Sequence, residues 1–313
     1  MKPARLFQQY IWLVNTLRQK GKLTLKEIND LWVNNKVIGG SPLSRTSFYR
    51  HKEAILNMMG IIIECEKNTN KYFIANPEEL DDDSIGRWML STLTVNAALS
   101  DCAGIKNRIL LENAPSGEEF LEPIINAIKT DHRLKMGYRK FNSEGYVKVI
   151  CPYALKRFQQ RWYLLALNDE EKMRIYAIDD RTTMMEMTDQ TFEMPEDFSP
   201  EEYFAEYFGV LTLDIPMAHV VVRAYDFTPN YLSTLPLHHS QRELESGDHY
   251  TDFSFDIRPT DDFLGKLFSY RDGIEILEPS DLREKMKQLI AKTLKRYLAA
   301  PHEETHHAGT GTV

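Results

Sequence analysis

The segment SRTSFYRHKEAILNMMG, residues 44–60, carries side chains that can contact the base edges and phosphates of DNA. Ser44 can cap a helix here, and its apolar residues would face a core: Phe48, Ile55, Leu56 and Met59. In helix-turn-helix proteins one helix, the recognition helix, lies in the major groove, and its first residues reach base edges. Arg, Ser and Thr supply donors and acceptors for such contacts. The side chains available for such contacts are Arg45, Thr46, Ser47, Tyr49, Arg50 and Lys52. The segment therefore predicts a recognition helix.

The residues that follow, 61–77, have the pattern of two short strands joined by a polar turn, Asn68-Thr69-Asn70. Lys67 and Lys71 flank this turn. A basic hairpin directly after a recognition helix is typical of a wing, which contacts phosphates. We therefore expect Lys67 and Lys71 to contact DNA as well.

The elements before the recognition helix support the same interpretation. Apolar residues at helical spacing predict a helix over 4–19, and Gly21 provides its stop. Thr24 and Glu27 form a capping box that opens a second helix, and the Gly-Gly-Ser-Pro run at 39–42 ends it. Residues 1–78 are thus predicted to form a winged helix-turn-helix. The alternative is a helical protein-interaction module with one hairpin.

Charge is distributed unevenly along the chain. Residues 1–77 hold twelve Lys and Arg against five Asp and Glu, a net +7, so the remainder carries −15 of the total of −8. Cationic side chains gain affinity for DNA by releasing its counterions. A basic N-terminal module in front of an acidic body therefore favours duplex binding by the N-terminal module alone.

The middle of the chain changes from helical to strand-like. The acidic turn Asp81-Asp82-Asp83 precedes a mostly helical stretch, so residues 79–115 are predicted to form a helical linker. This linker could transmit a signal, support dimerisation or only pack against its neighbours. Ser116 and Glu119 then form a capping box before another helix.

Short runs with strand character follow the helix: LKMGYRKF, YVKVICPYALKRF, RWYLLALN and MRIYAID. Polar turns separate them, which predicts a small antiparallel sheet or a β barrel of five strands. Alternation along the third run puts Arg161 and Tyr163 on one face and Trp162 and Leu164 on the other. We expect the second pair in the core.

An ordered set of residues in this region resembles the WYL domain: Tyr138, Pro152-Tyr153 with Leu155, Arg161-Trp162-Tyr163-Leu164, Arg174-Ile175-Tyr176-Ala177-Ile178-Asp179 and Arg181. The resemblance implies an Sm-like or SH3-like barrel over residues 116–195. It also implies a face of aromatic and basic residues that binds a regulatory ligand, a nucleotide or a single-stranded nucleic acid. The candidate ligand-binding residues are Tyr138, Tyr153, Arg161, Tyr163, Arg174 and Arg181. Many members of the family have a histidine where this chain has Cys151.

The C-terminal third suggests a further domain. Ser199, Pro200 and Glu202 open a short helix that closes at Gly209, within a linker over residues 196–217. Strands and helices alternate from residue 218, which predicts a ferredoxin-like α+β domain over 218–300 and a flexible tail over 301–313. The stretches PLHHSQREL and GIEILEPSDLREKM resemble the WCX extension found behind WYL domains. In relatives this extension is associated with dimer contacts and with gating of the sensor.

Several other chemistries are not expected. The string His-Glu-Glu-Thr-His at 302–306 matches the zinc-protease motif, but it follows Pro301 and lies within a few residues of the end of the sequence. His238 and His239 have no second cluster with ligand spacing, and the three cysteines lie far apart. There is no phosphate-binding glycine loop and no nucleophile elbow. We therefore expect no catalytic residue, no metal site and no cofactor.

The sequence contains no apolar run long enough for a membrane span and no signal peptide, so we expect a cytoplasmic protein. The resemblance as a whole is to a WYL domain-containing transcriptional regulator, a multidomain α+β protein. Such a protein would be a homodimer that binds a double-stranded DNA operator under the control of its ligand. The alternatives are a nucleic-acid-processing enzyme or its accessory, and a protein-interaction adaptor without sequence-specific DNA binding.

Overall fold

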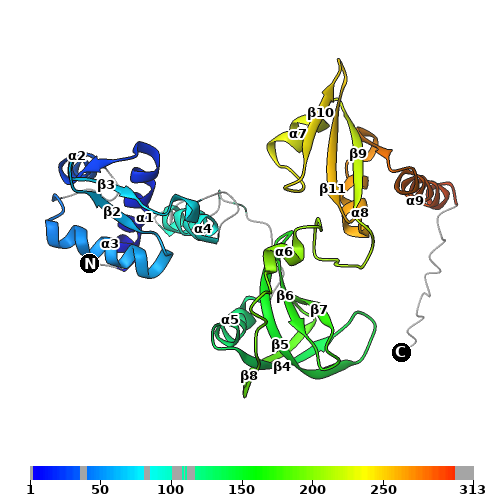
Figure 1. Cartoon of the computed structure of the whole chain (residues 1–313), viewed down its shortest axis with the longest axis horizontal. Coiled ribbons are helices and arrows are strands. Elements are labelled where there is room, and N and C mark those ends of the chain that lie inside the picture. The colour runs from blue at the N-terminus through cyan, green and yellow to red at the C-terminus, as the bar shows by residue number, and fades with distance from the viewer. Residues whose placement is uncertain are drawn as a thin grey trace, which may run out of the picture. The chain divides into compact units, whose positions relative to one another are not determined.

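The computed structural model describes residues 3–35, 41–80, 85–100, 108, 110 and 117–299. The chain divides into two compact units, residues 1–112 and 113–313 (Figure 1). Several predicted features lie outside the described residues. These are Gly39 and Gly40 of the Gly-Gly-Ser-Pro run, the acidic turn at 81–83, the part of the linker that surrounds 108 and 110, Ser116 of the second capping box, and the tail with its His-Glu-Glu-Thr-His string.

The first unit forms a helical bundle with a small sheet, in the order that the sequence predicts. Its elements are α1 (Pro3–Lys20), β1 (Leu23–Thr24), α2 (Leu25–Val33), α3 (Arg45–Met59), β2 (Ile63–Glu66) and β3 (Lys71–Ile74), then η1 (Pro77–Leu80) and α4 (Ile85–Ser100). The predicted capping box is confirmed, because Thr24 Oγ1 accepts from Glu27 N and Glu27 Oε2 accepts from Thr24 N. The short strand β1 was not predicted; it joins the hairpin in a sheet of order β1-β3-β2.

Helix α3 is capped at both ends, at its start by Ser44 as predicted. The Ser44 side chain accepts from Ser47 N, and Gly60 ends the helix in the left-handed region with φ 68°. Phe48, Ile55 and Met59 are buried, but the prediction for Leu56 is wrong, since 46% of its surface is exposed. His51 takes the inward position instead and lies 3.3 Å from Gln9 Oε1. The buried stripe of α3 therefore follows a spacing that leaves Leu56 on the outer side.

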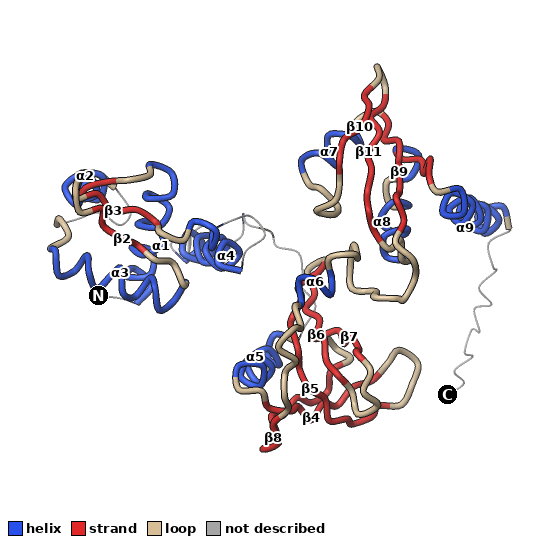
Figure 2. The backbone as a smooth tube through the Cα atoms, in the orientation of Figure 1, coloured by secondary structure: helices blue, strands red, loops and turns tan. Residues whose placement is uncertain are grey.

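The second unit begins with a five-stranded antiparallel sheet. Its elements are η3 (Glu118–Phe120), α5 (Leu121–Lys129), β4 (His132–Arg139), β5 (Gly145–Phe158), β6 (Arg161–Leu167), β7 (Met173–Ile178) and β8 (Thr182–Thr191). The strand order is β7-β6-β5-β4-β8. The long strand β5 pairs with β4 through residues 145–150 and with β6 through 151–158, with a register shift next to Pro152. One bent strand thus belongs to both halves of the sheet (Figure 2).

Two clusters of apolar side chains cover the two faces of β6. Leu164 is fully buried in the cluster that also holds Leu134 and Ile124, and Trp162 packs against it. The predicted core positions of Trp162 and Leu164 are therefore confirmed. Leu165 belongs to a second cluster, with Cys151, Tyr153 and Phe204.

The rest of the second unit has a sheet of four antiparallel strands. Its elements are α6 (Pro200–Phe204), β9 (Ala218–Tyr225), α7 (Thr228–Thr234), β10 (Arg242–Ser246), β11 (Tyr250–Ile257), α8 (Asp261–Phe268), η4 (Arg271–Gly273), β12 (Ile274–Glu278) and α9 (Ser280–Leu298). The strand order is β10-β11-β9-β12. Helix α6 starts at the predicted place, where Ser199 accepts from Glu202 N, but it ends at Phe204 and does not reach Gly209. Strand β10 was not predicted, because all five of its residues are exposed and give no alternation of buried side chains.

Side chains from strand β5 and from helix α8 bind the segment that follows α6. Lys156 Nζ on β5 donates to Gly209 O at 2.8 Å and lies 4.0 Å from the centre of the Phe204 ring. From the other side, Asp262 Oδ2 accepts from the backbone amides of Val210 and Leu211, each at 3.1 Å. The backbone of this junction, residues 205–211, is thus bonded to β5 on one side and to α8 on the other.

Two more residues extend the junction. The His238 ring lies 2.8 Å, through Nε2, from Ala205 O. Arg258 bonds Glu206 and the carbonyl of Ile215. Burial lowers the pKa of Lys156 to about 8, although the nearby Asp262 charge acts in the opposite direction. The junction is a packed and hydrogen-bonded part of the second unit.

None of the helices in the described part of the chain is both long and apolar enough to span a membrane.

Candidate ligand and nucleic-acid surfaces

Asp179, in the turn after β7, holds two of the predicted ligand-binding arginines. Arg181 donates to it through Nε at 2.9 Å, through Nη2 at 2.8 Å and through its backbone amide at 3.1 Å. Arg161 Nη1 donates to the same carboxylate at 3.0 Å. Burial acts to raise the pKa of Asp179, which is only 6% exposed, but the hydrogen bonds and charges of the two arginines outweigh it and lower the pKa. The carboxylate therefore stays ionised and fixes both guanidinium groups.

A cavity of about 490 Å³ opens beside Arg181, and we call it the tyrosine cavity. It is lined by four cationic side chains and three tyrosines: Lys140, Lys148, Arg174 and Arg181, and Tyr138, Tyr146 and Tyr176. These residues come from β4, β5, β7 and the turns around them. The size is within the usual range for small-molecule sites.

The electrostatics of the tyrosine cavity favour an anion. Burial raises the pKa of Tyr138 and Tyr146, and raises that of Tyr176 to about 12, so all three hydroxyls stay protonated. Glu170 also lines the cavity and is bonded by Lys172 at 3.1 Å, while Lys148 bonds Asp169 at 3.0 Å and lies 3.7 Å from Glu170. The cavity thus presents hydroxyl donors, together with the positive charge of Lys140, Arg174 and Arg181, to a ligand.

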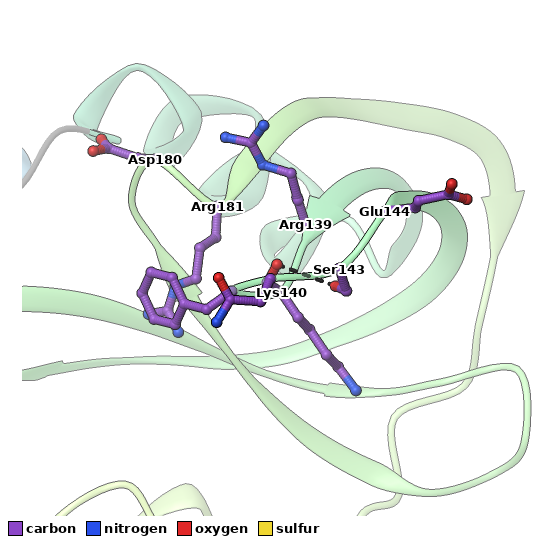
Figure 3. A pocket seen from close by; sticks show the side chains of 8 residues that line it. Arg139, Lys140, Ser143, Glu144, Asp180 and Arg181 are labelled. Atoms are coloured by element: carbon purple, nitrogen blue, oxygen red, sulfur yellow. Dashed lines mark hydrogen bonds between the residues drawn. The ribbon is translucent and has the colours of Figure 1, made fainter. Parts of the chain in front are cut away.

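A second cavity, of about 660 Å³, lies at the turn between β4 and β5, and we call it the turn cavity (Figure 3). Residues 139–144 line it together with Asp180 and Arg181. Figure 3 shows that Arg139 and Lys140 point in opposite directions from neighbouring positions. Lys140 and Arg181 line both cavities, so the two sites adjoin.

The predicted DNA-binding residues of the first unit lie on two of its elements. Arg45, Thr46, Tyr49 and Arg50 are exposed on the first two turns of α3. Ser47 is half-buried, and its amide and hydroxyl both bond Ser44 Oγ in the cap.

The lysines among the predicted DNA-binding residues differ in exposure. Lys52 is half-buried, with its ammonium 5.5 Å from the centres of the Tyr49 and Tyr72 rings. Lys67 is exposed in the turn of the hairpin, and Lys71 is half-buried at the start of β3. Lys22, which sequence reasoning did not select, bonds Glu66 of the same hairpin at 2.5 Å. The hairpin is thus tied to the loop before α2.

Family models match two parts of the second unit. One, described as the WYL domain, matches residues 119–180, and the other, described as the WCX domain, matches residues 216–294. The chain carries a WYL domain followed by a WCX domain. The predicted resemblance is therefore confirmed. Strands β4–β7 and most of the lining of the tyrosine cavity belong to the WYL domain.

Two solved structures are similar to the chain. One is the proteasome accessory factor B/C (PafBC) of Arthrobacter aurescens, with 18% identity over 99% of this chain and 50% of that chain and a TM-score of 0.40. The chain thus spans about half of its length. The other is described as a CRISPR Cas-related protein, with 14% identity over 94% of this chain and 85% of that chain and a TM-score of 0.39. No curated protein matches the chain.

The six predicted ligand-binding residues of the WYL domain do not all lie together. Tyr138, Arg174 and Arg181 line the tyrosine cavity, and Arg161 is linked to it through Asp179. Tyr163 is half-buried on β6, paired in register with Lys156 and Ala177, and is not among the lining residues.

Tyr153 lies in a different environment. It is 8% exposed and stacks on Phe192, with ring centres 5.8 Å apart and planes 9° apart. Cys151 belongs to the same cluster, and burial raises the pKa of its thiol. The position where many WYL domains have histidine is therefore packed under the segment leading to α6, and it does not line the tyrosine cavity.

Lys140, Tyr146 and Lys148 were missed by sequence reasoning, and Tyr176 and Asp179, although part of the WYL motif, were not selected as ligand-binding residues. Tyr146 and Lys148 are two residues apart on β5, so they share a face of that strand. An aromatic and a cation on one face were a usable signal. Asp179 precedes Arg181 by two residues, a spacing at which Asp side chains often bond the backbone amide of a turn.

Within the part of the chain that the structure describes, no three side chains of His, Cys, Asp or Glu are grouped so that they could hold a metal ion.

Proposed function

We propose that the chain is a ligand-responsive, DNA-binding transcriptional regulator of the cytoplasm. In this proposal the first unit is a winged helix-turn-helix that binds duplex DNA, and the tyrosine cavity of the WYL domain binds an anionic effector. The effector is a nucleotide or a single-stranded nucleic acid. The protein acts as a homodimer on a two-fold symmetric operator.

One observation carries the effector half of the proposal. Four cationic side chains and three protonated tyrosines converge on one cavity, and Asp179 holds Arg181 in a fixed orientation there. A guanidinium fixed in this way loses little freedom when it binds phosphate, so its donors are already placed. Proteins usually bind single-stranded nucleic acid by stacking its bases on aromatic rings and by placing cationic side chains along its backbone.

The DNA half rests on the element order and on charge. A capped helix with Arg45 and Arg50 exposed in its first turns, followed by a hairpin with Lys67 at its turn, supplies both base-edge and phosphate donors. In the second unit, the small antiparallel sheet of the WYL domain supports assignment as an Sm-like or SH3-like barrel. The strand order β10-β11-β9-β12, with α7 and α8 between strands, supports assignment of the WCX domain as ferredoxin-like.

Binding of the effector is expected to depend on Arg174. Its guanidinium makes a long hydrogen bond of 3.4 Å to Met173 O, so its other donors remain available to a ligand. Replacing Arg174 with alanine should weaken binding of fluorescently labelled ATP or of a labelled single-stranded oligonucleotide about tenfold or more, the usual worth of a charged hydrogen bond. Fluorescence anisotropy measures this directly.

The matched control is Arg133→Ala, which removes an exposed arginine of β4 that does not line the cavity. Its affinities should equal those of the wild type. Equal weakening by both substitutions would show that binding depends on overall charge and would contradict a specific site in the tyrosine cavity.

Duplex binding is expected to depend on Arg50. Its replacement by alanine removes an exposed cation from the second turn of α3 and should weaken binding to DNA from upstream of the gene about tenfold. A gel mobility shift at increasing salt measures this, and the wild-type affinity should fall steeply as salt rises.

Lys292→Ala on α9 provides the control, because it removes an exposed cation from the other unit and should leave the shift unchanged. The DNA-binding proposal fails if the wild type gives no shift even at low salt. Such a result would favour a protein-interaction adaptor.

A further inference from the structure

Phe141, at the turn between β4 and β5, has an unusual setting for a large apolar side chain. It is 74% exposed, and it lines the turn cavity. The guanidinium carbon of Arg181 lies 4.8 Å from the centre of its ring, which is within the range of a cation–π contact. Part of the ring is therefore covered by a cation, and most of its surface is open.

Arg181 is not free to move with the ring, because Asp179 binds it at Nε, Nη2 and the backbone amide. The Phe141 ring thus contacts a planar guanidinium group, that of Arg181, whose orientation is fixed by Asp179. An aromatic ring held on such a support is ready to stack a second planar group without further ordering of the protein.

Phe141 lies next to the tyrosine cavity, so a group stacked on its ring can belong to a ligand that is bound there. Arg181 and Lys140 line both cavities, so the ring lies at the border of the anion-binding site. A ligand that places a phosphate among Arg174, Arg181 and Lys140 has its next chemical group near Phe141. This step rests on the function proposed above.

We propose that Phe141 is the stacking platform of a second subsite, which accepts the planar heterocycle of a phosphorylated effector. The tyrosine cavity takes the phosphate, and the turn cavity takes the base. The subsite selects nucleotides over phosphates that lack an aromatic ring, and it tolerates different bases because every base has a π face.

The test compares ligands that differ only in the presence of a base. Adenosine 5′-monophosphate is paired with ribose 5-phosphate, and a short single-stranded oligonucleotide is paired with an abasic strand of the same length. The first pair represents a free nucleotide and the second a nucleic acid. Wild-type protein should bind the base-containing member of at least one pair about tenfold more tightly, as expected for one base–aromatic stack.

Phe141→Leu should abolish this preference and leave the affinity for the base-free member unchanged. Phe141→Trp should restore the preference, and the added indole fluorescence should be quenched only by the base-containing ligand. Phe227→Leu, which changes another exposed phenylalanine in the WCX domain, is the control and should keep the wild-type preference.

Each other outcome contradicts the inference in a recognisable way. If the wild type binds both members of each pair equally, stacking is excluded while anion binding in the tyrosine cavity stands. If Phe141→Leu weakens both members equally, Phe141 only supports Arg181. If no ligand of either pair binds, both the subsite and the proposed effector class are wrong.

Discussion

Replacing Asp179 with alanine is expected to lower the free energy of unfolding by about 2 to 4 kcal/mol, because it leaves two arginines without the buried carboxylate that pairs them. This loss is expected at the lower end of the range for broken buried pairs, because 42% of the Arg161 side chain and 21% of the Arg181 side chain are exposed and partly hydrated. Urea denaturation of the whole chain measures the loss.

The same substitution should also remove effector binding. Without Asp179 the Arg181 guanidinium loses its hydrogen bonds from Nε and Nη2, and with them its orientation at the border of both cavities. Asp179→Asn keeps the size of the side chain but not its charge, so it should fall between alanine and the wild type. Asp189→Ala, an exposed acid on β8, should change neither stability nor binding. If Asp179→Ala bound the effector like the wild type, the fixed arginine would not be part of the site.

Acidification should destabilise the second unit through His238. Burial lowers the pKa of this imidazole to about 4, and the nearby charges of His239 and Lys156 act in the same direction, while the hydrogen bond to Ala205 O acts against it. In the neutral ring Nε2 donates to Ala205 O, while Nδ1 lies 2.7 Å from Ser240 Oγ and accepts from Ser240 N at 3.3 Å. The cost of a second proton on the ring therefore comes mainly from burial of the charged form.

The sign of the pH effect follows from comparing the two states. In the unfolded chain His238 has an ordinary pKa of about 6.5, so below that value the unfolded state binds more protons than the folded state. Stability is therefore complete above about pH 6.5 and is lost as the pH falls towards 4. From about pH 7.5 to about pH 5 the free energy of unfolding should fall by about 2 kcal/mol because of this residue alone.

The measurement compares urea denaturation of the wild type and of His238→Gln at both pH values. A glutamine amide can still donate to Ala205 O but does not titrate, so the variant should lack the part of the acid loss that His238 causes. Burial also lowers the pKa of His51 in the first unit, and this contribution is common to both proteins. Equal acid losses in the two proteins would show that His238 titrates alike in the folded and unfolded states.

The sequence predicted the elements whose signals are local. Thr24 and Glu27, or Ser44 before α3, act within one helical turn, so their residue types alone predict the cap. Alternation on β6 placed Trp162 and Leu164 correctly, because one face of that strand packs on the core whatever its neighbours are. Strand β10 had no such signal, because it pairs with β11 at the edge of the sheet and buries none of its side chains.

The site was predicted less completely, because its composition depends on contacts between distant strands. Tyr138 and Tyr153 are both buried tyrosines of the WYL motif, yet only Tyr138 faces the tyrosine cavity. The difference arises where β5 bends next to Pro152 and passes from β4 to β6, which no local pattern shows. Tyr176 comes from β7, which β6 separates from β5 in the strand order, yet its ring centre lies 5.4 Å from that of Tyr138 on β4.

The junction at residues 205–211 determines how the WYL and WCX domains can be exchanged between proteins. It lies between the two matched ranges, yet its backbone is bonded by Lys156 from one domain and by Asp262 and His238 from the other. A recombination event that joined a foreign WCX domain at residue 216 would leave Lys156 facing a junction without its acidic neighbour. The two domains and the segment between them should therefore be exchanged as one unit, and a chimaera should keep residues 117–299 together.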